Sequence, residues 1–149
     1  MSRYFEEFKI GDTFRTPSKT ITEGAITMMV GLAGLTSPLF VDEEYAKKTP
    51  FGTRIAPGRL TLLLMGGLEE QLGLYDETVI ALVGFDNIQF TAPLKAGDTI
   101  YVDMKIIDLK ETRKPDRGIV VHRSTCFNQH SEALVQSDTT HVIKRRADH

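Results

Sequence analysis

Residues 31–64 read GLAGLTSPLFVDEEYAKKTPFGTRIAPGRLTLLL, and this stretch decides the fold of the chain. Residues 42–48 predict a short helix in which Asp42 is the N-cap, glutamates occupy the first turn and lysines the last, as the helix dipole favours. A turn is expected at 49–52. Residues 59–74 then predict a long helix that is apolar nearly all round, which is typical of a buried helix.

A glycine pair, Gly66-Gly67, lies in the middle of this second helix. Glycine inside a helix costs about 1 kcal/mol relative to alanine, so the pair needs a reason. The sequence leaves two explanations open. The helix approaches a sheet closely at this point, or it breaks there.

The second half of the chain predicts strands. Residues 79–83 and 87–91 flank Gly84, which suggests a β-bulge. Further strands are expected at 118–128 and 133–143, and before them apolar residues alternate with polar ones in the period of two of a half-buried strand: Ile100, Val102, Met104 and Ile106. One buried helix followed by consecutive antiparallel strands predicts an α+β domain, a sheet wrapped around a central helix.

Upstream of the quoted stretch, residues 3–12 predict an irregular arm. Residues 13–20 predict a strand with an edge or bend at Pro17, because proline cannot donate to a sheet ladder. Thr22 is the expected N-cap of a helix that ends at Gly34. Its apolar face would carry Ile26, Met29, Val30 and Ala33.

Composition limits the class of protein. A chain of 149 residues suits one domain spanning 1–149, and its net charge of -2 gives no basic field for nucleic acid. The single cysteine, Cys126, predicts a reducing compartment, and no apolar run is long enough for a membrane span. The N-terminus does not look like a signal peptide, so the cytoplasm is expected. The polar end of the chain, 144–149, predicts a frayed tail.

The quoted stretch resembles the signature segment of the MaoC-like family of (R)-specific enoyl-CoA hydratases and dehydratases. The frame residues that carry the likeness are Gly34, Pro38-Leu39, Asp42, Tyr45-Ala46, the Thr49-Pro50-Phe51-Gly52 turn, Ile55-Ala56, Gly58 and Leu60-Thr61. The resemblance implies a hot-dog fold, and it extends to the FEEFKIGD and FTAPLKAGDTI stretches. It also implies a homodimer or larger homo-oligomer, because hot-dog domains commonly join edge to edge or pack helices across a two-fold axis.

The positions that would perform the family's chemistry are changed. The family pattern Gly-Asp-x-Asn-Pro-Leu-His here reads Gly-Leu-Thr-Ser-Pro-Leu-Phe, so Leu35 stands at the catalytic aspartate, Ser37 at the asparagine and Phe40 at the catalytic histidine. In the resembling enzymes a carboxylate and an imidazole activate one water. Neither Leu35 nor Phe40 can do so. The catalytic residues are therefore unknown, with Asp42 and Thr36 as candidates beside expected structural roles as helix cap and turn.

The resemblance implies that backbone amides near the start of the central helix polarise the thioester carbonyl. The substrate-binding candidates there are Phe40, Pro57, Gly58 and Thr61, although Pro57 has no N–H to give. Arg54 and Arg59 are candidates for the phosphates of a CoA-type carrier, because guanidinium groups match phosphate oxygens. Their alternative role is an exposed charge or an ion pair with neighbouring acidic residues.

Other titratable residues favour structural roles. Glu69 and Glu70 resemble the acidic residue of hot-dog thioesterases, but a solvated helix end is the simpler expectation. His122 and His141 on strands are expected to be hydrogen-bonded or exposed, and Cys126 to be a small buried hydrophobe. No spacing of Cys and His predicts a metal site, and no cofactor is expected.

Three hypotheses of function follow. The first is a hydratase or dehydratase acting on a fatty acyl thioester through an atypical site. The second is an inactive subunit that binds an acyl-CoA or acyl-carrier thioester and pairs with an active homologue, since Leu35 and Phe40 would leave a dry, apolar slot. The third is a thioesterase, which requires a carboxylate facing the thioester.

Overall fold

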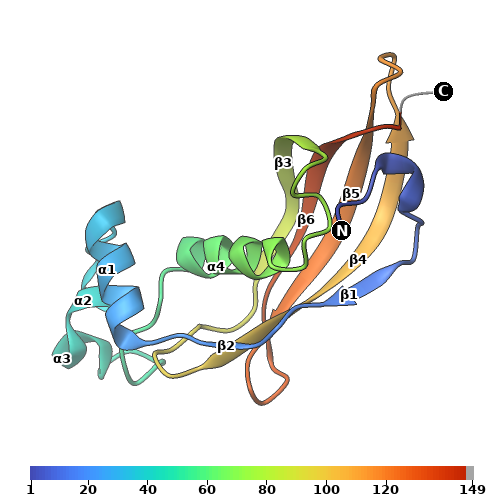
Figure 1. The fold of residues 1–149 in the computed structure, drawn as a ribbon. Coiled ribbons are helices and arrows are strands. Elements are labelled where there is room, and N and C mark those ends of the chain that lie inside the picture. Colours follow the sequence, from blue (N-terminus) through green and yellow to red (C-terminus); the bar gives the residue numbers. More distant parts are fainter. Residues whose placement is uncertain (147–149) are drawn as a thin grey trace.

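A computed structural model of the protein describes residues 1–146 as a curved antiparallel sheet with one long helix against its concave face (Figure 1). The last residues of the predicted tail, 147–149, lie outside the described residues. The elements are η1 (Phe5–Glu7), β1 (Thr13–Arg15), β2 (Lys19–Thr20), α1 (Glu23–Ala33), α2 (Pro38–Val41), α3 (Glu43–Ala46), α4 (Gly58–Glu70), β3 (Val79–Phe90), β4 (Thr99–Glu111), β5 (Arg117–Phe127) and β6 (Ala133–Lys144).

The sheet has the strand order β1-β4-β5-β6-β3, and β2 also pairs with β4. All of these pairs are antiparallel. The four long strands follow one another in sequence, but β3 lies beyond β6 and forms an edge (Figure 1). Helix α4 packs on β4 and β6, so the predicted α+β arrangement around a central helix is confirmed.

The core lies between α4 and the sheet. The four alternating residues of β4, from Ile100 to Ile106, are each at most 1% exposed, which confirms the predicted buried face. Ile100 and Val102 belong to one cluster with apolar residues of α4, among them Leu60, Met65 and Leu68. A second cluster, built on Met104 and Ile106, is covered by the N-terminal arm through Phe5 and Phe8.

The predicted helix caps are present. The Thr22 side chain accepts a hydrogen bond from the Ala25 amide at 3.1 Å, and Gly34 ends α1 in the left-handed conformation with φ of 70°. The Asp42 carboxylate accepts one from the Tyr45 amide at 3.0 Å, where α3 begins. The strand predicted at 13–20 is divided around Pro17 into β1 and β2.

Helix α4 corrects two expectations. It ends at Glu70 rather than at residue 74, because Gly73 takes φ of 65° and turns the chain toward the N-terminal arm. It also runs unbroken through Gly66-Gly67. A Cβ atom added at either glycine would have no heavy atom within 4 Å, so close approach to the sheet does not explain the pair.

Strand β3 is continuous where two strands were expected. Its pairing with β6 shifts register between Leu82 and Gly84, as a bulge near Gly84 requires, and again around Asn87, which has φ of 51°. Every residue of β3 except Gly84 is exposed. Among residues 1–146, no helix is both long and apolar enough to cross a membrane.

Candidate functional site

The N-terminus of α4 is the centre of the candidate site. Pro57 is the N-cap and has no N–H, while the Leu60 and Thr61 amides donate back to its carbonyl at 2.9 and 3.3 Å. Within residues 1–146 the Gly58 and Arg59 amides have no hydrogen-bond acceptor. The first N–H groups of a helix carry partial positive charge and suit an oxygen that develops negative charge.

A hollow of about 540 Å³ adjoins this helix end. Gly58, Arg59 and Thr61 from α4 line it, together with Phe90 at the end of β3. A Cβ on Gly58 would lie 2.7 Å from the Phe90 ring, so only glycine lets this aromatic ring lie against the start of α4. The structure therefore brings three of the predicted substrate-binding residues to one hollow.

The two changed catalytic positions line other hollows. Leu35 follows the end of α1 and lines a hollow of about 270 Å³ with Pro57, Arg59 and Leu60. Phe40, in α2, lines a smaller one of about 170 Å³ and packs on the main core cluster. Helix α2 was not predicted. Both side chains are partly buried and apolar, so neither can deprotonate water. The carboxylates that share the Phe40 hollow, Glu23 and Glu43, are ion-paired with Arg54.

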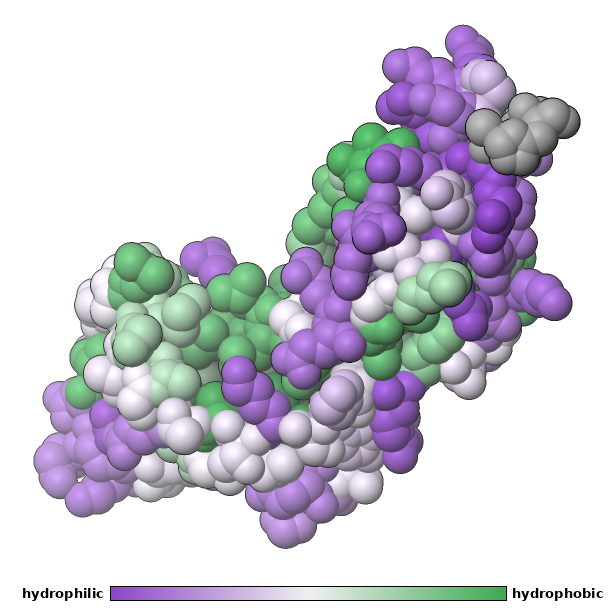
Figure 2. Space-filling model, viewed as in Figure 1, coloured by the Kyte–Doolittle hydropathy of each residue, from purple (hydrophilic) through white to green (hydrophobic). Residues whose placement is uncertain are grey.

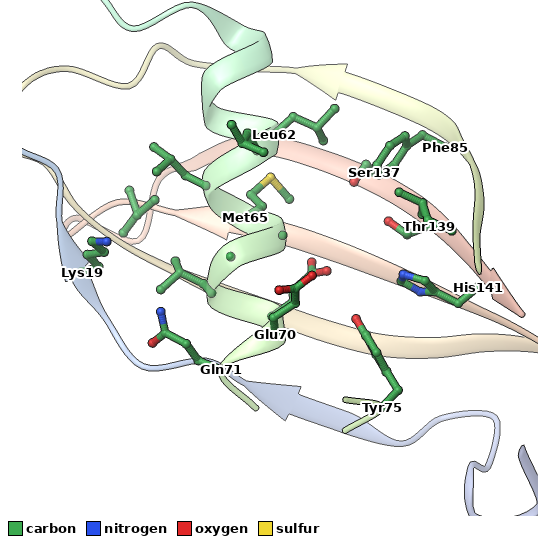
Figure 3. Close-up of a pocket in the computed structure, with 18 of the residues that line it drawn as sticks. Lys19, Leu62, Met65, Glu70, Gln71, Tyr75, Phe85, Ser137, Thr139 and His141 are labelled. Atoms are coloured by element: carbon green, nitrogen blue, oxygen red, sulfur yellow. The ribbon is translucent and has the colours of Figure 1, made fainter. Parts of the chain in front are cut away.

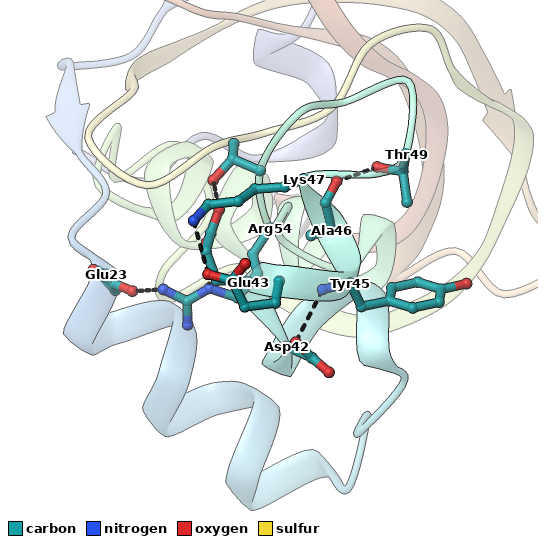
Figure 4. A network of polar contacts seen from close by, with 10 residues as sticks. Glu23, Asp42, Glu43, Tyr45, Ala46, Lys47, Thr49 and Arg54 are labelled. Carbon is teal, nitrogen blue, oxygen red and sulfur yellow. Dashed lines mark hydrogen bonds and ion pairs between the residues drawn. The ribbon is translucent and has the colours of Figure 1, made fainter.

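Arg54 is held by acidic neighbours (Figure 4). Its guanidinium donates to Glu43 at 2.8 Å and also to Glu23, and these hydrogen bonds raise the pKa of Arg54. Hydrogen bonds from Thr53 and then Arg54 lower the pKa of Glu43. The ion pair was the alternative expected from sequence. Arg59 is exposed and makes no ion pair within the described residues.

The catalytic candidates near the changed positions lie on the surface. Asp42 is exposed and caps α3, as expected for its structural role. Thr36 and Ser37 are exposed, and Ser37 precedes α2 without making a side-chain cap. Apart from the cap made by Asp42, none of these three side chains has a hydrogen-bond partner within residues 1–146 that would arrange it for catalysis.

A polar cluster at the other end of α4 was missed. Glu69 is only 5% exposed, and His122 Nε2 donates to its carboxylate at 3.1 Å. The expectation of a solvated helix end is therefore wrong for Glu69, although Glu70 is exposed. The reason is geometric: Glu69 follows Leu68 on the face of α4 that covers the sheet, and its partner is 53 positions away in the chain.

The neighbours of this pair are held uncharged. His141 stacks on Tyr75 and on His122, with ring centroids 4.7 and 5.5 Å apart. Burial lowers the pKa of His141 to about 4, with the charge of His122 acting in the same direction. Burial, followed by the charge of Glu69, raises the pKa of Tyr75 above its usual range. Both rings are therefore neutral at pH 7.

Cys126 is buried, as predicted, and burial raises the pKa of its thiol to about 12. It is therefore a packing residue rather than a nucleophile. In the part of the chain that the structure describes, no three residues of the types that bind metals come together.

An antiparallel sheet wrapped around one helix, with a hollow at the start of that helix, defines the hot-dog class of domain. A protein of Mycobacterium tuberculosis described as having a double hotdog fold superimposes with a TM-score of 0.84 at 19% identity, covering 99% of this chain and 46% of that one. The model of the MaoC like domain matches residues 6–126. The chain belongs to this family of hydratases and dehydratases.

Two relatives match over nearly the whole chain. The (R)-specific enoyl-CoA hydratase of Rhodospirillum rubrum is 31% identical over 143 residues, which cover 96% of this chain and 93% of that protein. The structure of a monoamine oxidase regulatory protein from Archaeoglobus fulgius has a TM-score of 0.91 and 31% identity, covering 98% of this chain and 97% of that one. These matches confirm the resemblance stated from the sequence.

Proposed function

We propose that the protein binds an acyl-CoA or acyl-carrier thioester with the thioester carbonyl at the N-terminus of α4. The observation that carries this proposal is the pair of Gly58 and Arg59 amides, which have no acceptor within residues 1–146, beside the 540 Å³ hollow. Donors fixed in this way stabilise a carbonyl oxygen as negative charge develops on it. Membership of a family of acyl-thioester hydratases supports the same ligand class.

The site favours binding without the family's water activation. Losing one general base costs about 10²–10⁴ in rate, and here both the carboxylate and the imidazole positions are apolar. Leu35 lines a hollow whose other lining residues are apolar except for Arg59. Such a chain can serve as the acyl-binding subunit beside an active homologue.

Catalytic hydration or dehydration by other residues is the second candidate. It is favoured by the 31% identity to a named (R)-specific enoyl-CoA hydratase along almost the full length of both proteins. An assay of the purified protein with crotonyl-CoA and a longer trans-2-enoyl-CoA separates the two. Loss of enoyl absorbance at an enzymatic rate would establish catalysis, and calorimetric binding without turnover would establish the binding function.

The changed pair can be tested by restoring it. Leu35→Asp combined with Phe40→His should create or raise hydratase activity, because it returns an acid–base pair to a frame that keeps the helix N-terminus. The matched control, Leu35→Asn with Phe40→Gln, adds similar polarity without a titrating group. Equal activity of the two folded double variants would contradict the role assigned to these positions.

Arg59 is the better candidate for contact with the carrier's phosphates. It lines the hollow, is exposed and is not ion-paired within the described residues, whereas Arg54 already binds two carboxylates. Arg59→Ala should weaken binding of a CoA thioester but not of the matching thioester of N-acetylcysteamine, which lacks phosphates. Unchanged affinity for CoA would exclude this contact.

A second copy of the chain is the partner that fits the exposed surface. Strand β3 is an edge strand that exposes seven apolar side chains: Val79, Ile80, Leu82, Val83, Phe85, Ile88 and Phe90. Figure 2 shows further apolar surface over α1 and α4, where Met28, Leu32 and Leu63 are exposed. An open apolar edge is an aggregation hazard unless it is covered, and pairing β3 with its copy satisfies its free backbone groups.

A further inference from the structure

A cavity of about 430 Å³ lies beside the C-terminal half of α4, at the end of the helix opposite to Gly58. Leu62, Met65 and Phe85 supply apolar parts of its wall. Polar groups supply another part, and Figure 3 shows Ser137, Thr139 and His141 in a row along β6 with Tyr75 facing them from beyond the helix. A cavity of this size falls in the range that small organic ligands occupy.

The polar wall is not explained by the needs of the fold. The Nδ1 atom of His141, which lines the cavity, is buried without a hydrogen-bond partner among the described residues. The same is true of His122 Nδ1 and Ser124 Oγ, which do not line the cavity but lie on β5 opposite Thr139 and Ser137. Leaving such a group unpaired costs about 1–3 kcal/mol. Farther along the same strands the equivalent core positions are apolar, with Cys126 on β5 and Val135 on β6. Polar residues are therefore concentrated where the cavity lies.

The glycine pair of α4 gives the cavity its width. Gly66 and Gly67 both line it, and a Cβ on either would point into open space. Each glycine therefore lowers the stability of the helix by about 1 kcal/mol relative to alanine, and no packing within the chain compensates for this loss. Space for a bound molecule accounts for glycine at these two positions.

The charges around the cavity limit what it can hold. Tyr75 and His141 are neutral at pH 7, since burial shifts both pKa values away from their charged forms. Ser137 and Thr139 add hydroxyl groups that both donate and accept. Glu69, Glu70 and Lys19 also line the cavity, so a carboxylate or phosphate would meet two carboxylates against one ammonium group, whereas an uncharged hydroxyl would find both donors and acceptors.

We propose that this cavity receives the far end of the acyl group, and that it selects acyl groups carrying an uncharged hydroxyl at that end over plain alkyl chains. The inference rests on the proposed function, acyl-thioester binding. Glu69 is eleven residues beyond Gly58, so the cavity lies roughly 16 Å along α4 from the carbonyl site of the same chain. The second copy proposed above would close the open side of the cavity next to β3.

The test compares matched thioesters by calorimetry: dodecanoyl-CoA with ω-hydroxydodecanoyl-CoA, and hexanoyl-CoA with ω-hydroxyhexanoyl-CoA, whose acyl chain is too short to reach the cavity from the carbonyl site of the same chain. The wild-type protein should bind one of the hydroxylated forms about tenfold more tightly than its alkyl partner, which corresponds to the gain of about one well-formed hydrogen bond. Thr139→Val should reduce this preference several-fold without weakening the alkyl thioester, because valine keeps the shape and removes the hydroxyl.

The neighbouring residue provides the control. Thr140 follows Thr139 on β6, and successive side chains of a strand point to opposite faces, so Thr140→Val should leave the preference unchanged. Binding of both members of each pair with equal affinity would overturn the inference and leave acyl-thioester binding intact. Absence of binding to all four thioesters would overturn the proposed function and the inference with it. Should Thr139→Val not fold, the wild-type comparison still decides.

Discussion

At the scale of single residues, His141 makes stability depend on pH. Its pKa is lowered from 6.5 to about 4 by burial and by His122, while Glu69 opposes the shift. The folded state therefore binds this proton less tightly than the unfolded state does. The contribution of neutral His141 is complete above pH 6.5 and is lost as the pH falls toward 4. Between pH 7.5 and 5 we expect a loss of about 2 kcal/mol in the free energy of unfolding.

Urea denaturation at several pH values measures this loss. His141→Gln cannot titrate, so its stability should change less between pH 7.5 and 5 than that of the wild type. His130, on the exposed turn between β5 and β6, provides the control, and His130→Gln should keep the wild-type slope. Parallel pH profiles for wild type and His141→Gln would show that His141 does not carry the effect.

At the scale of elements, one glycine of α1 and one of α4 lie in similar surroundings and can be compared by substitution. A Cβ at Gly31 in α1 or at Gly66 in α4 would meet no atom within 4 Å. Either Gly→Ala change should therefore raise the free energy of unfolding by up to about 1 kcal/mol, because alanine favours the helix. Only Gly66→Ala narrows the cavity, so it alone should weaken binding of a long-chain acyl thioester. Equal affinities in the two variants would contradict a ligand beside Gly66.

Local patterns were enough to predict most elements. Thr22, Gly34 and Asp42 satisfy backbone groups next to them in the chain, and the alternation in β4 follows from one strand having two different faces. The order of the sheet was harder, because β3 pairs with β6 across more than forty residues of sequence, as in the pairing of Phe90 with Val135.

The candidate site could be predicted only in part, because some of its residues come together from distant parts of the sequence. Gly58 and Thr61 were found because the family frame marks them, and Arg59 because a guanidinium group matches phosphate oxygens; the three lie close together at the start of α4. Glu69 was misinterpreted because a glutamate near a helix end is usually solvated, and nothing nearby in sequence announces His122. One signal in the sequence could have identified Glu69: a charged residue placed directly after the last apolar residue of a buried helix.

At the scale of the whole molecule, the exposed edge of β3 predicts a dimer. The chain has a mass of 16.7 kDa, and light scattering at micromolar concentration should give twice that value. Val83 is 60% exposed in β3, so Val83→Asp should leave the fold intact but place a charge at the joined edge in each copy. We expect this variant to be largely monomeric, since burying two like charges at one interface is costly.

Ile10→Asp is the control for this experiment, because Ile10 is exposed to a similar extent, 64%, but lies in the N-terminal arm away from β3. It should remain a dimer. If the wild-type protein is a monomer, the proposed pairing of two copies is wrong, and the apolar side chains of β3 would be covered by a different subunit. If Val83→Asp stays dimeric while the wild type does too, the copies meet elsewhere, and the exposed residues of α1, Met28 and Leu32, become the surface to change next.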